Sequence, residues 1–206
     1  MREQHDLLGT LDLVSEHPRR YLDRECAMSL GAFLVGYKMA DSGAAQPLRQ
    51  LLERIPGPDA ADACTRAFLA RGAGAASLHY TIRELRMVVA NGRLTSSPGP
   101  MATKTPIEQV RAALASGRLG MYFGEPTVMW VSNYYHGFLR GLAAVNRAEW
   151  LREEEQLRTF ETWLRARYGH EAPSWHELIR AYEGPCESGI KRFTELWDEF
   201  ESDGAS

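Results

Sequence analysis

The sequence lacks the features of a membrane-spanning or secreted protein. No stretch approaches the roughly 18 uninterrupted apolar residues that a membrane helix needs. The first segment, MREQHDLLGTLDLVSEHPRRYLD, is charged and has no apolar core of the kind found in secretory signals. Only 3 cysteines occur, far apart and without a CxxC pair. We therefore expect a cytoplasmic protein with buried free thiols and no membrane partner.

A concentration of basic residues is also missing. The chain has 24 Lys and Arg against 27 Asp and Glu, and its cations are spread along the whole length. Nucleic-acid binding depends on a basic surface that neutralises phosphates, so we expect no nucleic-acid partner. Hydrophobic residues form 44% of the sequence, which is typical of a chain that folds around a packed core.

Familiar catalytic and metal-binding motifs are absent as well. The six histidines form no pair at i, i+4 and no Glu-x-x-His pattern, so we assign no metal. There is no Gly-x-Ser-x-Gly elbow for a nucleophilic serine and no Gly-x-x-x-x-Gly-Lys loop for phosphate. These absences favour a protein without a cofactor, and a binding protein over an enzyme.

The residues that are present predict an all-α fold. Apolar residues recur at spacings of three and four nearly throughout. Capping boxes are predicted at Thr105 with Glu108 and at Ser174 with Glu177. The expected helices cover residues 7–14, 24–40, 47–55, 78–89, 105–117, 126–145, 148–168 and 186–200, with further helices beginning at Asp59 and Ser174.

A segment near the middle divides the chain. Residues 93–104, RLTSSPGPMATK, are rich in Ser, Thr, Pro and Gly and have no helical period, which predicts a linker. It separates a first helical repeat, 1–92, from a second, 105–206. Together the halves have the size of one compact domain.

The two halves resemble each other in sequence. At a constant offset of 101, Tyr21 aligns with Tyr122 and Gly36 with Gly137, and an offset of 111 aligns the ends of the halves. Glycine inside a helix costs about 1 kcal/mol relative to alanine, which indicates close approach of another backbone at both positions. We therefore predict two diverged helical repeats packed with pseudo-twofold symmetry, with a groove between them.

The second half also carries a family resemblance. The matching residues are Arg118, Gly120, Met121, Tyr122 and Gly124, then Gly137, then Ser174 with Trp175, and finally Trp197, Asp198, Glu199 and Phe200. This pattern resembles small uncharacterised bacterial helical proteins with an Arg-Pro-Gly-Met-Tyr-like turn, some of them found in toxin-immunity neighbourhoods. Leu119 stands where proline is usual. The resemblance implies a bacterial protein of immunity type and no established activity.

The strongest candidate cluster lies on the long helix of the second half. Asn133 and His136 are spaced i, i+3, so they share a helix face and could act together, with the histidine as acid or base. Trp130, Tyr134 and Tyr135 are expected to form aromatic walls beside them. Tyr21 and Tyr122, which precede the long helices of the two halves, complete the aromatic binding residues. The alternative is that these aromatic residues are core and that His136 is an ordinary helix residue.

Two functions follow from these patterns. The leading hypothesis is a non-enzymatic protein that binds a protein partner, with a basic toxin as the most concrete version. The acidic residues Glu195, Asp198 and Glu199 would then attract that partner, unless they are only a solvated face. The alternative is a small-molecule enzyme or sequestering protein that uses the aromatic groove between the repeats.

Overall fold

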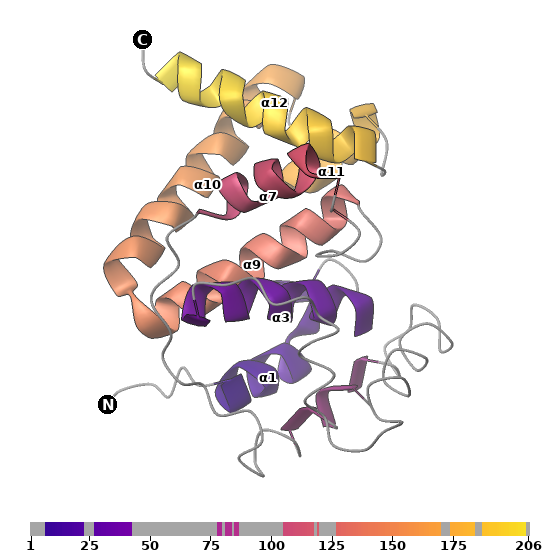
Figure 1. Ribbon diagram of the computed structural model, residues 1–206, viewed down its shortest axis with the longest axis vertical. Coiled ribbons are helices and arrows are strands. Elements are labelled where there is room, and N and C mark those ends of the chain that lie inside the picture. Colours follow the sequence, from indigo (N-terminus) through magenta and orange to yellow (C-terminus); the bar gives the residue numbers. More distant parts are fainter. Residues whose placement is uncertain are drawn as a thin grey trace.

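All secondary structure in the described part of the chain is helical. The computed structural model describes residues 7–22, 27–42, 78–79, 81–83, 85–86, 105–117, 119, 127–169, 174–183 and 187–204. Its helices are α1 (Leu7–Glu16), α2 (Pro18–Tyr21), α3 (Ala27–Ser42), α7 (Pro106–Ala115), α9 (Val128–Val145), α10 (Arg147–Tyr168), α11 (Trp175–Glu183) and α12 (Glu187–Gly204), arranged as in Figure 1. The all-α prediction is confirmed.

The predicted helix boundaries agree with the structure to within a few residues where they can be compared. The main difference in the first half is α2, a single turn that begins at Pro18 and that the sequence pattern did not reveal. The predicted helices at 47–55 and after Asp59 lie outside the described residues, as does the predicted linker at 93–104.

Side-chain caps explain where several helices begin. The capping box before α7 is confirmed, because Thr105 N donates to Glu108 Oε2 at 2.7 Å and Glu108 N donates to Thr105 Oγ1 at 3.4 Å. The predicted box at Ser174 forms differently. Ser174 Oγ donates to the Glu177 carboxylate at 3.3 Å, whereas Trp175 N donates to Glu161 Oε1 of α10 at 3.2 Å. A carboxylate from a packed neighbour thus caps α11.

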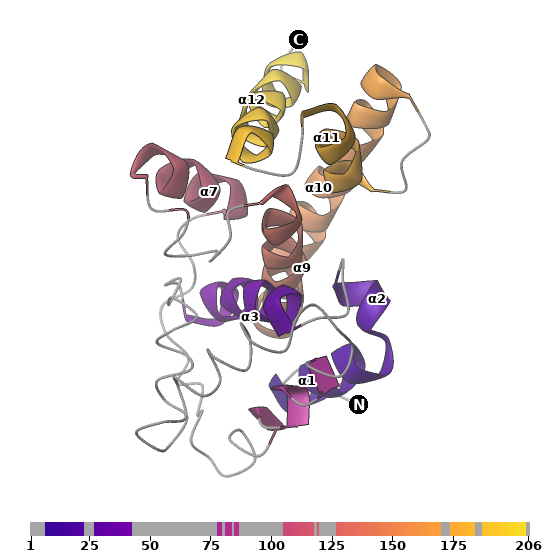
Figure 2. The same ribbon diagram turned by 90° about the vertical axis from the view of Figure 1, so that its right-hand side faces the viewer.

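Helix α9 is the centre of the fold. It is buried on almost every side, because α3 covers one face and α7, α10, α11 and α12 pack around the rest. Two perpendicular views show α9 between the first-half helices and the α10–α12 group (Figures 1 and 2). No helix in the described part of the chain is long and apolar enough to cross a membrane.

Helices α3 and α9 pack backbone against backbone. A Cβ atom on Gly36 would overlap with the Tyr134 carbonyl, and one on Gly137 would overlap with the Phe33 carbonyl. Gly141 lies against Tyr37 and Ala40, so the contacts advance along both helices together and the helices run parallel. Small residues spaced by four allow this close approach. The expected close contact at both glycines is present.

An aromatic cluster joins the remaining helices of the second half. Phe160 of α10 lies 4.5 Å from the Trp197 ring of α12, measured between centroids, and Trp175 of α11 stacks on Phe193 at 4.8 Å. All four side chains are buried. Aromatic pairs contribute stability beyond their buried area, so this cluster holds α10, α11 and α12 against α9.

The glycine contact gives a direct test of the fold. Replacing Gly137 with Ala should lower the free energy of unfolding by about 3 kcal/mol, because the new methyl group meets a backbone carbonyl that no rotamer change can move. Urea denaturation of the full chain measures this loss. Gly204→Ala is the matched control, since nothing lies within 4 Å of its Cβ position, and it should leave stability unchanged or slightly higher.

Candidate functional site

A groove lies where α2 of the first half meets α9 and α10 of the second. It has a volume of about 240 Å³. Its lining residues come from all three helices and are Arg20, Tyr21, His136, Leu139, Arg140, Ala143, Trp150 and Glu154. The groove thus combines side chains that are more than 100 residues apart in the sequence.

Helical spacing explains how α9 and α10 line the groove. The four residues from α9 are spaced i, i+3, i+4 and i+7, which places them on one face. Trp150 and Glu154 of α10 are spaced i, i+4 and also share a face. Gly137 and Gly141 occupy the adjacent face of α9 against α3. The groove therefore lies beside the contact between the two helices.

The two aromatic walls are held by neighbouring groups. The Tyr21 ring packs edge-on against Phe33 of α3, with 6.3 Å between centroids, and the Arg20 guanidinium lies 5.9 Å from the Tyr21 centroid. Arg147 lies 4.6 Å from the Trp150 centroid. Both rings are partly exposed, so they present apolar surface to whatever occupies the groove.

The charged groups of the groove are not paired with each other. Among the described residues, Arg20, Arg140 and Glu154 form no ion pair, and Arg140 Nε is buried without a hydrogen-bond acceptor. By contrast, Arg111, Arg167 and Arg192 elsewhere in the second half each contact carboxylates. A buried guanidinium N–H group without an acceptor costs free energy. The positive charges of Arg20 and Arg140 are not balanced by ion pairs within the described residues.

His136 contributes an imidazole to the groove. Burial lowers the pKa of its side chain below the usual 6.5, which favours the neutral form of the ring. The expected partner Asn133 does not join it. Asn133 Nδ2 donates to the Met129 carbonyl at 2.8 Å, and the side chain is buried. Asn133 lies four residues before Gly137, which places it on the face that packs against α3.

Most of the aromatic residues predicted as walls lie in the core instead. Trp130, Tyr134 and Tyr135 are buried and do not line the groove. Tyr135 packs in the aromatic cluster, where its hydroxyl has no hydrogen-bond partner among the described residues and where burial raises its pKa. Of the aromatic residues predicted to take part in binding, Tyr21 lines the groove. Tyr122 lies outside the described residues.

Sequence reasoning missed Trp150, Arg140, Arg20 and Glu154. The sequence did contain a signal that these residues share helix faces, because Arg140 follows His136 by one turn and Glu154 follows Trp150 by one turn. The sequence did not show that these two short rows face each other.

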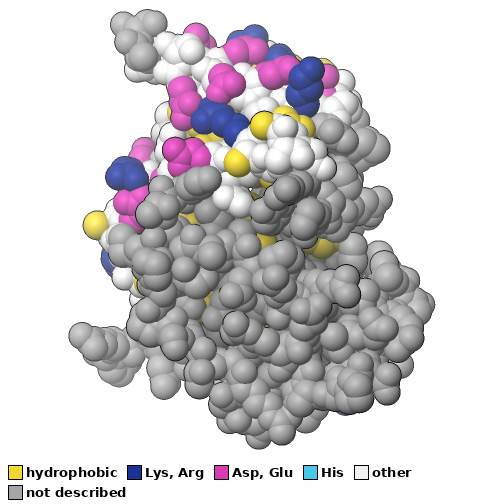
Figure 3. Space-filling view, in the orientation of Figure 1, with side chains coloured by type: hydrophobic (Ala, Val, Ile, Leu, Met, Phe, Trp, Pro, Cys, Tyr) yellow, Lys and Arg dark blue, Asp and Glu magenta, His cyan; other side chains and the backbone are white. Residues whose placement is uncertain are grey.

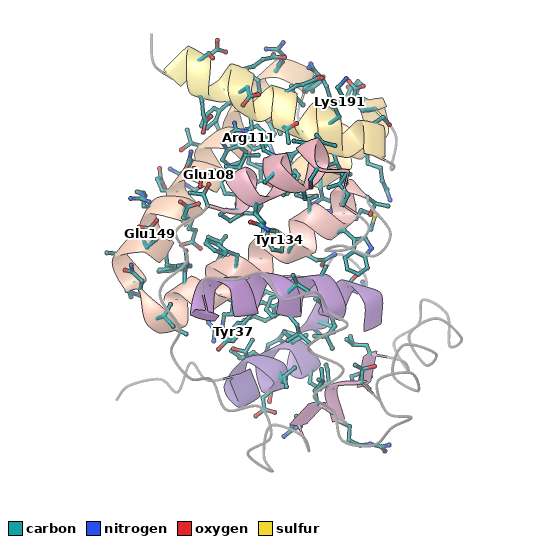
Figure 4. All side chains as sticks on the ribbon, in the orientation of Figure 1. Tyr37, Glu108, Arg111, Tyr134, Glu149 and Lys191 are labelled. Atoms are coloured by element: carbon teal, nitrogen blue, oxygen red, sulfur yellow. The ribbon has the colours of Figure 1, made fainter. Side chains whose placement is uncertain are left out.

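The acidic residues predicted to attract a partner are paired within the protein. Asp198 and Glu201 both contact Arg111 of α7, the latter at 3.0 Å, and Glu199 contacts Arg167 at 2.6 Å. Glu195 contacts Arg192 at 3.3 Å. Figure 4 shows Arg111 extending from α7 toward α12, and Figure 3 shows acidic and basic side chains intermixed over α12.

One carboxylate of α10 is buried. Glu153 is 3% exposed, and burial raises the pKa of its side chain, as does repulsion from Glu149. Arg152 lies 3.8 Å away and partly offsets both effects. Within the described ranges, no group of three or more His, Cys, Asp or Glu side chains is placed to hold a metal ion.

Comparison with known proteins finds no match to a protein-family model, to a curated protein or to a solved structure.

The buried histidine of α11, His176, makes stability depend on pH. Burial, together with the nearby His136 and Arg180, lowers the pKa of His176 from 6.5 to about 3. The unfolded chain therefore binds a proton that the folded protein does not bind over this interval, and the free energy of unfolding should fall as the pH drops from 6.5 toward 3. His176→Gln should weaken that dependence. Urea midpoints at several pH values measure it, and an identical slope in the variant would contradict the assignment.

Proposed function

We propose that this chain is a cytoplasmic protein that binds a small molecule in the groove between its two halves. One observation carries the proposal: a groove formed by both halves has two aromatic walls and guanidinium groups that no described carboxylate neutralises. Ligand sites are commonly concave and combine aromatic and apolar walls with polar groups that fix the ligand's orientation. This groove has both kinds of lining, with a larger share of polar groups than is usual.

We also propose that the halves are diverged copies related by a pseudo-twofold axis. The support is the reciprocity of the contact between α3 and α9. Gly36 lies against Tyr134, and Gly137 lies against Phe33. Both glycines and both aromatic residues correspond under the offset of 101, so the contact maps onto itself when the halves are exchanged. The groove would then lie at the junction of the two copies.

Divergence between the copies would have created the site in only one of them. The position equivalent to His136 is Val35, which is completely buried. The second half also contains all five tryptophans, and one of them lines the groove. A duplicated scaffold with one polar site is therefore the arrangement that we propose.

Binding is better supported than catalysis. Among the described residues, no side chain forms a hydrogen bond with His136 that would orient it as an acid or base. Binding of a basic protein partner has less support, because Glu195, Asp198 and Glu199 are already paired with arginines. Paired surface carboxylates attract a partner less strongly than free ones.

Purification from the native host tests the proposal. Mass spectrometry should find a small molecule that co-elutes with the wild-type protein and is reduced about tenfold with Trp150→Ala, which removes one wall of the groove. Tyr182→Ala is the matched control, since Tyr182 is an exposed aromatic residue outside the groove, and it should retain the molecule.

Either of two results would overturn the proposal. A stoichiometric protein partner that binds wild type and Trp150→Ala equally, with no small molecule, would support the immunity-type function instead. A small molecule that is retained fully by Trp150→Ala would place the site elsewhere. Circular dichroism of both variants confirms that they remain folded.

A further inference from the structure

We propose that the ligand of the groove is a small aromatic monoanion, a single planar ring that carries one carboxylate. Its ring would contact Trp150 and Tyr21, and its carboxylate would bind Arg140. This inference rests on the proposed function, because it names the ligand class of the same groove.

The state of Arg140 points to an anion. Its side chain is partly buried, and Nε has neither a hydrogen-bond acceptor nor contact with solvent. A carboxylate accepts two parallel hydrogen bonds from a guanidinium, which makes it a better acceptor for this group than a neutral oxygen. Because Nε is closed off from solvent, a ligand in the groove would bind the terminal guanidinium nitrogens of Arg140, and its carboxylate would supply the negative charge that no ion pair of Arg140 provides among the described residues.

The charge of the groove selects a single negative charge. Arg20 and Arg140 supply two positive charges and Glu154 supplies one negative charge, while burial lowers the pKa of His136 and so favours its neutral form. Arg147 beside Trp150 adds a further positive charge at the edge. A cation would meet repulsion from the arginines. Glu154 offsets one of the two lining arginines, so the lining carries one net positive charge, and a ligand with a single negative charge balances it.

The walls and the size of the groove specify a ring. Trp150 and Tyr21 offer aromatic surface, and Leu139 and Ala143 of α9 offer aliphatic surface between the charged groups. Planar rings bind such surfaces through stacking and apolar contact. The volume of about 240 Å³ lies below the range typical of sites for drug-sized ligands, so one ring fits and a nucleotide does not.

Calorimetric titration of the full chain at pH 7 tests this assignment with four probes. Benzoate combines a ring and a negative charge, benzamide has the same shape without the charge, benzylamine has a positive charge, and acetate has the charge without the ring. Benzoate should bind about tenfold more tightly than benzamide. Benzylamine and acetate should bind more weakly than either.

A pair of arginine variants locates the anion. Arg140→Met should lower benzoate affinity about tenfold, to the level of benzamide, and leave benzamide binding unchanged. Arg158→Met is the matched control, because Arg158 lies on α10 outside the groove and pairs with Glu155 at the surface. It should leave the affinities for both probes unchanged, and urea denaturation confirms that both variants are folded.

The outcomes separate the ligand class from the function. Equal affinity for benzoate and benzamide, or an unchanged benzoate affinity in Arg140→Met, would overturn the ligand class. If none of the four probes binds while a co-purified molecule is lost with Trp150→Ala, the ligand class is wrong and the proposed function stands. If no probe binds and no small molecule co-purifies, both proposals fail.

Discussion

The direct contact between the backbones of α3 and α9 is the constraint on which the rest of the structure depends. Phe33 can rest on Gly137 only because that position has no side chain, and Gly36 accommodates Tyr134 in the same way. The contact also positions the groove. Tyr21 packs on the Phe33 ring, and His136 directly precedes Gly137, so a shift of α3 would separate the two sides of the groove.

The aromatic cluster of the second half performs a complementary role. By holding α10, α11 and α12 against α9, it fixes the face of α10 that carries Trp150 and Glu154. Most tryptophans of the second half serve this packing, since Trp130, Trp175 and Trp197 are buried. Most of the tryptophans in that half therefore belong to its core, and Trp150 is the one that lines the groove.

Charge is distributed unequally between the surface and the groove. On α12 the acidic side chains meet arginines from α7, α10 and α12 itself, and exposed pairs of this kind contribute little to stability. In the groove, Arg20 and Arg140 have no such partners among the described residues. In the described part of the chain, the groove therefore holds two arginines without a carboxylate partner, whereas the acidic side chains of α12 named above are paired with arginines.

The sequence by itself determined the helices, the cap at Thr105 and the importance of Gly36 and Gly137, because these depend on local spacing and on the size of single residues. It also predicted a groove beside His136, but with Trp130, Tyr134 and Tyr135 as its walls, and these three side chains are buried. Only the tertiary structure decided which face of α9 stays open. An apolar helix that is covered on nearly all sides shows no polar stripe, so its pattern did not separate buried Tyr134 from groove-lining Arg140. The pairing of Asp198 with Arg111 and of Glu199 with Arg167 was likewise fixed by contacts between different helices, whereas Glu195 pairs with Arg192 of its own helix.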